Sequence, residues 1–180
     1  MRYIKAILLL AAFMIIFTGL ALLSQVRIHY GETIAVRQNG DIAINNLITS
    51  GASIDQLEAA LNHDPSVAKR VLITGHTLLL SAVHYDRMDA ALLLLQHGAN
   101  PCMPGRVEKE GPSRPSAMES VAVHGQLEFV RLFLSKHEST IRDLPVLSQA
   151  LREAKHGQHH EIASLIESAI NRLQDRPDPN

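Results

Sequence analysis

The feature that most constrains the fold of this chain is a recurring pattern of helix, tight turn, helix and glycine stop. The pattern is complete between Gly75 and Pro101, recurs between Ala122 and Leu134, and returns in looser form between Ala154 and Ile166. Ala-x-His triplets begin at positions 82, 122 and 154, so the spacing varies around a period of about 33 residues. Repetition at this period predicts a stack of similar units.

These segments resemble the ankyrin repeat family. The family pattern runs Gly-x-Thr-Pro-Leu-His-x-Ala, then Ala-x-x-Gly-His-x-Glu-Ile-Val, then a Leu-Leu pair before Gly-Ala-Asp/Asn-Pro. The best match is Ala122 to Leu134. Residues 75–101 match both ends of a repeat, but Leu78 replaces the proline, Leu80 replaces the histidine, and one extra residue follows Ala82. The resemblance implies weaker hydrogen bonding between repeats at this unit.

Apolar residues at helical spacing agree with the resemblance, as in Leu92, Leu95 and Ala99. A two-helix unit cannot bury such a stripe alone, so neighbouring units must share it. We therefore predict an all-α ankyrin-type helix-turn-helix solenoid of about four repeats. Its predicted parts are units at 41–65, 75–101, 116–138 and 146–172, an insertion at 102–115 and a flexible tail at 173–180. The alternative is an ordinary helical bundle, which requires neither the recurrent turn nor a Gly-Ala-Asn-Pro stop.

The beginning of the chain predicts a membrane segment. A basic stretch at 1–5 precedes Ala6 to Leu23, which carries no charge, and a linker follows at 24–40. As a helix the apolar run spans about 27 Å, close to the ~30 Å hydrocarbon thickness of a bilayer. We favour a retained transmembrane or signal-anchor helix. A cleaved signal peptide is the main alternative, because Gly19-Leu20-Ala21 offers small residues for a peptidase, and a buried core helix is the other.

The charges that flank this run predict its orientation. Arg2 and Lys5 precede it without acidic neighbours, whereas acidic residues dilute the basic ones that follow. The positive-inside rule then places the amino terminus in the cytoplasm and the repeats outside. We expect a bacterial protein, held in the inner membrane by a single pass with its repeats in the periplasm. Cleavage of the segment would instead release a secreted or periplasmic protein.

Composition argues against a nucleic-acid-binding protein and against a disulfide-stabilised fold. The chain has 17 basic and 18 acidic residues and no tryptophan, so it lacks both the basic field and the stacking platform of a nucleic-acid-binding groove. Its single cysteine excludes an intramolecular disulfide. We expect no nucleic-acid partner, and a fold that depends on packing alone.

The insertion at 102–115 interrupts the repeat rhythm. Three prolines and two glycines exclude a helix there. In ankyrin proteins the turns project beside the concave helical face and commonly touch partners, so the resemblance implies a contact surface. The predicted contacts are Arg106, Glu108, Lys109 and Arg114 in the insertion, with His84, Tyr85, Arg87, His124 and Gln126 at the turns. A tolerated surface insertion is the alternative.

No catalytic or metal-binding constellation stands out. His156 and His160 lie four residues apart, but Gly157 falls in the predicted turn between them, so they need not share a helical face. His84, His124 and His156 occupy the same place in three units, which predicts a structural role such as hydrogen bonding to turn backbone. Cys102 is expected in an exposed loop, without strong cues for a lowered pKa. We predict no enzyme, no cofactor and no metal.

The sequence thus favours a non-enzymatic protein-protein interaction module, tethered to a membrane and monomeric apart from its partner. A sharper hypothesis is an immunity or inhibitor protein that neutralises a secreted toxic enzyme, such as a phospholipase or a cell-wall hydrolase. Another is an accessory protein for an exported enzyme such as a catalase. The identity of the partner does not follow from the sequence.

Overall fold

The computed structural model describes residues 40–105, 114–136 and 143–175. The predicted membrane segment at 6–23, most of the linker and the middle of the insertion lie outside the described residues. Within them, no helix is both long and apolar enough to cross a membrane.

The described part of the chain is helical, which confirms the all-α prediction for these residues. A helical segment at 40–49 is followed, in chain order, by α2 (Ile54–His63), the short 3-10 helix η1 (Pro65–Lys69), α3 (Leu78–His84), α4 (Met88–Gln96), α5 (Ala117–His124), α6 (Leu127–Lys136), α7 (Leu144–His156) and α8 (His160–Gln174). An isolated antiparallel bridge joins Val71 to Thr77 ahead of α3. Because α8 continues through Gln174, the first residues of the predicted tail are helical.

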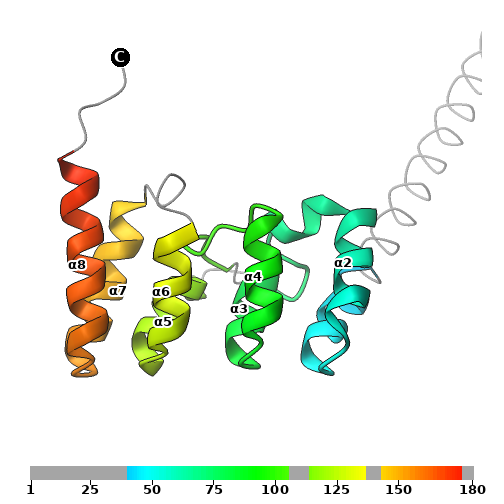
Figure 1. Cartoon of the computed structure of the whole chain (residues 1–180), viewed down its shortest axis with the longest axis horizontal. Helices are drawn as coiled ribbons and strands as arrows, with labels where there is room; N and C mark the ends of the chain where they lie inside the picture. The colour runs from blue at the N-terminus through cyan, green and yellow to red at the C-terminus, as the bar shows by residue number, and fades with distance from the viewer. Residues whose placement is uncertain (1–39, 106–113, 137–142, 176–180) are drawn as a thin grey trace, which may run out of the picture. The chain divides into compact units, whose positions relative to one another are not determined.

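The helices alternate between two layers, as Figure 1 shows for α3 to α8. One layer holds α2, α4, α6 and α8, and the other holds α3, α5 and α7. Contacts join α3 to α4, α5 to α6 and α7 to α8 within pairs, and corresponding helices of successive pairs also touch along each layer. This arrangement is a helical solenoid, in which each unit borrows its neighbour's surface to complete its core.

Side-chain caps start the helices where the sequence carries Ser, Thr or Asp. Ser53 and Ser116 each form a capping box with the residue three positions on. Thr77 accepts a hydrogen bond from the Leu80 N–H at 3.1 Å, so α3 begins cleanly although Leu78 replaces the family's proline. Leu78 and Leu80 are buried, at 0% and 1% exposure. The two departures from the family pattern therefore add apolar surface to the core.

One backbone hydrogen bond recurs at the end of the first helix in every pair. It runs from an N–H to the carbonyl five residues earlier, as in a Schellman motif. The four bonds are Ala52 to Leu47 at 3.0 Å, Arg87 to Ala82 at 2.8 Å, Gln126 to Val121 at 3.0 Å and His159 to Ala154 at 2.9 Å. Asp86, directly before Arg87, adopts the left-handed conformation at φ 51°, and the bond closes over five residues as in the other turns. Gly125 takes that conformation in the next pair.

The core runs continuously along the stack. Ala82, Ala122 and Ala154 are all at 0% exposure, which agrees with the prediction of small residues where helices approach closely. Larger side chains fill the space between the layers, including Leu94, Phe133 and Ile166, also at 0% exposure. Because these residues come from three successive pairs, the core is shared between units and not divided into separate ones.

Cys102 is part of this core, so the prediction that it lies in an exposed loop is wrong. Its exposure is 1%, and its N–H donates to the Asn100 side-chain oxygen at 2.9 Å. Burial raises the pKa of the Cys102 thiol to about 12, with smaller contributions from the negative charges of Asp143 and Glu119. The first residues after the glycine stop fold inward, which the proline-rich sequence did not reveal.

We expect the Cys102 thiol to be inert in the folded protein. Both burial and a raised pKa suppress the reactive thiolate. At pH 8, Ellman's reagent should modify Cys102 more than about 100-fold more slowly than free cysteine, because the thiolate is the reactive form, and the full thiol should appear in guanidinium chloride. Rapid labelling of the native protein would show that this part of the core opens readily.

Candidate functional site

The structure describes one of the four predicted contact residues in the insertion. Arg106, Glu108 and Lys109 lie outside the described residues, whereas Arg114 is described and exposed. The Gly105 N–H donates to the Arg114 carbonyl at 3.1 Å, so the two described ends of the insertion meet. A Cβ at Gly105 would lie 2.5 Å from the Gly75 carbonyl oxygen, so only glycine permits this approach. The insertion therefore starts and ends beside the Gly75 turn.

Three histidines and Arg114 form a cluster across α3 and α5, which we call the histidine face. The Arg114 guanidinium donates to Nε2 of His76. The His76 ring lies edge-on to the ring of His84, with centroids 6.3 Å apart. His84 Nε2 is 3.4 Å from the Ser120 hydroxyl of α5, and His124 Nδ1 donates to the Ser120 carbonyl at 2.8 Å. The face thus joins the Gly75 turn to two successive repeats.

Burial and like charges lower the pKa of two of these imidazoles. The pKa of His76 is lowered by burial and then by the positive charges of Arg114 and His84. The pKa of His84 is lowered by burial and then by His124. Since Arg has donors only, His76 Nε2 must be unprotonated to accept from Arg114. At neutral pH the imidazoles of His76 and His84 therefore resist becoming positive, and Arg114 supplies a permanent positive charge beside them.

Exposed apolar side chains adjoin this face in the sequence. Tyr85 is 55% exposed after His84, and Val123 is 44% exposed before His124. A partly exposed tyrosine supplies apolar area and a hydroxyl at small entropic cost, and tyrosine is enriched in protein interfaces. Of the predicted contact residues, the structure therefore brings together His84, His124 and Arg114, and the exposed Tyr85 follows His84 in the chain.

The remaining two predicted contact residues, Arg87 and Gln126, join repeats to each other. In three of the four helix pairs, the residue that follows the interhelical turn uses its side chain to donate to a carbonyl in the preceding unit. The three bonds are Arg87 Nη2 to Ala52 at 2.9 Å, Gln126 Nε2 to Val83 at 3.3 Å and His159 Nε2 to Val123 at 3.2 Å. Contact of Arg87 and Gln126 with a partner stays a prediction.

The structure places the hydrogen bond to backbone beside a turn on His159, and not on His84 or His124. His124 and His84 contact Ser120 and not turn backbone, whereas His159 bonds the carbonyl of Val123 beside the preceding turn. The repeat pattern in the sequence did not reveal that the residue after the turn links repeats, because Arg87, Gln126 and His159 fill this position in successive units. They share a donor group and no other chemistry.

Replacing Gln126 with alanine should lower the free energy of unfolding by about 1 kcal/mol. The substitution removes one hydrogen bond between repeats and leaves the Val83 carbonyl without its side-chain donor. Urea denaturation followed by circular dichroism measures the change. Gln96→Ala, at an exposed position on α4, is the matched control and should change stability by less than about 0.5 kcal/mol. Equal effects of the two substitutions would contradict a role for Gln126 in joining repeats.

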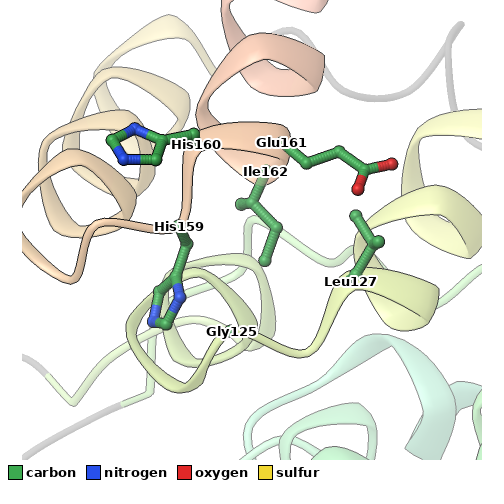
Figure 2. Close-up of a pocket in the computed structure, with 6 residues that line it drawn as sticks. All are labelled: Gly125, Leu127, His159, His160, Glu161 and Ile162. Carbon is green, nitrogen blue, oxygen red and sulfur yellow. The ribbon is translucent and has the colours of Figure 1, made fainter.

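A shallow hollow of about 180 Å³ lies where α5 and α6 meet the start of α8. Figure 2 shows the His159 side chain reaching towards Gly125, and Glu161 beside Leu127. A Cβ at Gly125 would lie 2.6 Å from His159 Cε1, so the imidazole fits only against glycine. Glu161 accepts from Arg131 of α6. His159 and Glu161 line the hollow, and both form hydrogen bonds to the preceding repeat. We therefore assign the hollow to repeat packing and not to catalysis.

The His156 and His160 pair falls on two helices. His156 ends α7 and His160 begins α8, with Gly157 as the cap between them. Across the described residues, no group of three or more His, Cys, Asp or Glu side chains is placed to hold a metal ion.

The stacked helix pairs, their shared core and the repeated turn define a helical repeat protein. Residues 74–106 match the ankyrin repeat family model, which supports the ankyrin repeat family for this chain. The match covers the predicted unit at 75–101 despite Leu78 and Leu80. No curated protein matches the chain. Ankyrin repeats are typically non-catalytic modules that bind other proteins, so the match supports an interaction function.

Proposed function

We propose that this chain is a non-enzymatic protein-protein interaction module that binds its partner across α3, α5 and the insertion. The ankyrin repeat match carries the proposal. The exposed Tyr85, Val123 and histidine face support the choice of surface, because they combine apolar area with hydrogen-bonding groups. Arg106, Glu108 and Lys109 extend the contact surface on the insertion. Arg87 and Gln126 set the spacing of the repeats beneath it.

Site-specific photo-cross-linking tests the proposed surface. A photoreactive phenylalanine analogue in place of Tyr85 should cross-link a defined partner in cells, whereas the same analogue at the exposed Asn171 of α8 should not. Charge reversal of Arg106 and Lys109 should reduce the Tyr85 cross-link and leave the melting temperature nearly unchanged. Equal cross-linking from Tyr85 and Asn171 would place the contact elsewhere or show non-specific capture.

The apolar run from Ala6 to Leu23 tethers the module to the bacterial inner membrane, with the repeats in the periplasm. The support is the charge-free length of the run and the basic residues ahead of it. The full chain should stay with membranes after alkaline carbonate extraction, and a periplasm-active reporter fused after Asn180 should be active. A mature chain that starts near Leu22 would show a cleaved signal peptide, and a reporter active only in the cytoplasm would reverse the topology.

An immunity or inhibitor role, or an accessory role for an exported enzyme, is a narrower form of the same function. Both require tight binding and no chemistry by this chain, and the proposed tether would hold the partner at the membrane. Deleting the gene should sensitise cells to a secreted toxin in the first case and lower the activity of an exported enzyme in the second. A neighbouring toxin or enzyme gene would indicate which experiment to begin with.

A further inference from the structure

Among the described residues, the histidine face brings together Arg114 and imidazoles that can become cationic, with few opposite charges nearby. Arg114 carries a full charge at every physiological pH, and its contact with His76 is to a neutral imidazole acceptor. Arg114 and His84 act on His76 as like charges, and His124 acts on His84 in the same way. A surface of this kind is complementary to a negatively charged ligand.

Acidic groups on the surrounding elements are largely engaged elsewhere. Asp41 and Asp64 pair with Arg70, Asp89 of α4 pairs with Arg87, Glu119 of α5 accepts from the Ser116 N–H, and Glu153 of α7 accepts from Gln149. Asp86 is exposed in the turn after α3, and Lys69 of η1 lies against Gly98. The charges that act on His76 are those of Arg114 and His84, and the charge that acts on His84 is that of His124.

We propose that the histidine face binds an acidic segment of the partner protein, rich in aspartate or glutamate, and that binding takes up protons at His76 and His84. The occupant follows from charge complementarity and from the exposed Tyr85 and Val123, which give a polypeptide apolar contacts that a small anion would not use. The inference rests on the proposed protein-binding function and specifies its partner chemistry and pH dependence.

Protonation changes the geometry of the face as well as its charge. A proton on His76 Nε2 removes the acceptor that holds the Arg114 guanidinium. Arg114 is then released and repelled, and both cations become available to carboxylates. A carboxylate near the face favours the charged imidazoles. By linkage, acid must tighten binding to the same extent that binding raises proton affinity.

The same groups set the pH dependence of the free protein. Since the pKa values of His76 and His84 in the fold lie below the ordinary 6.5, the unfolded chain binds protons more readily. These two groups therefore lower stability as pH falls through about 6.5 and add no further change below their pKa values in the fold. A bound acidic segment should reverse this loss. The melting temperature then serves as a second readout that needs no labelled ligand.

The test uses the full chain in detergent micelles and fluorescein-labelled octaaspartate as the probe. Fluorescence anisotropy at constant ionic strength should show binding that tightens about tenfold between pH 7.5 and 5.5. The double variant His76→Gln/His84→Gln keeps polar side chains but cannot titrate, and its affinity should change by less than about twofold over the same range. His63→Gln, at an exposed histidine on α2, is the matched control and should behave like the wild type.

Four outcomes of the octaaspartate test would overturn the inference. They are no octaaspartate binding at either pH, binding that is independent of pH, an unchanged pH dependence in the double variant, and equally tight binding of a single-stranded DNA octamer. The last result would mean a general polyanion surface. If the Tyr85 cross-link captures a partner equally at pH 7.5 and 5.5, the proposed binding function stands and the proton-linked inference fails. If Tyr85 captures no partner, the proposed function itself fails.

Discussion

Truncating Phe133 to alanine will lower the free energy of unfolding by about 3–5 kcal/mol. Phe133 lies in α6 at 0% exposure, and its ring centroid is 6.1 Å from that of Phe129. The alanine variant has a cavity between the two helix layers, and the surrounding side chains relax into it only in part. Because α6 contacts both α4 and α8, the loss should spread to the units on either side. Urea denaturation of the full chain measures the total effect.

Two further variants make the Phe133 result specific. Phe133→Leu keeps most of the volume and should cost clearly less than the alanine variant, within about 1–2 kcal/mol. Val123→Ala removes an apolar side chain that is 44% exposed, and should change stability by less than about 0.5 kcal/mol. Hydrogen exchange should show increased opening in α4 and α8 as well as in α6. An effect confined to α6 would contradict a core shared between repeats.

The second large effect is expected at the beginning of the repeats, where Asp41→Ala should cost about 3 kcal/mol. The Asp41 side chain is 3% exposed and lies 2.6 Å from the Arg70 guanidinium. Its second oxygen accepts from the Ile73 N–H at 3.2 Å. Alanine would leave Arg70 only its more exposed partner, Asp64, and would leave the Ile73 N–H without that acceptor. The pair ties the first helical segment to the turn before α3.

Thermal and urea unfolding of matched variants check this assignment. Asp41→Asn keeps the shape and one acceptor but loses the charge, so it should fall between the wild type and the alanine variant. Glu58→Ala removes an exposed carboxylate from α2 and should have an effect below about 0.5 kcal/mol. A loss at Asp41 no larger than that at Glu58 would mean that the ion pair contributes nothing net, as many ion pairs do.

Local sequence was sufficient to predict the helix pairs. The turn at Gly51, the stop at Gly98 and the cap at Gly125 each have positive φ, which glycine adopts without strain. The caps at Ser53 and Ser116 are similarly local, because each reaches a group only three residues away. Each of these glycines and caps acts on residues within about one helical turn, so it can be recognised from the sequence of that segment alone.

Candidate contact residues were only partly separable from structural ones. Tyr85 and Arg87 stand two positions apart in one turn, yet Tyr85 is 55% exposed while the Arg87 side chain is 16% exposed and bonds the preceding repeat. The repeat pattern in the sequence placed Tyr85 and Arg87 at the same interhelical turn. It did not show which side chain faces solvent, because that depends on the rotation of one unit against the next.

The sequence by itself determined the class of fold, since helix spacing, caps and glycine turns are local and repeat along the chain. The tertiary structure alone decided that Cys102 is buried, that the ends of the insertion meet beside Gly75, and that His76, His84 and Arg114 converge. Each of these features joins residues far apart in the chain. Their contacts depend on how far each unit is shifted and rotated against its neighbour, which close packing of side chains sets and local patterns do not encode.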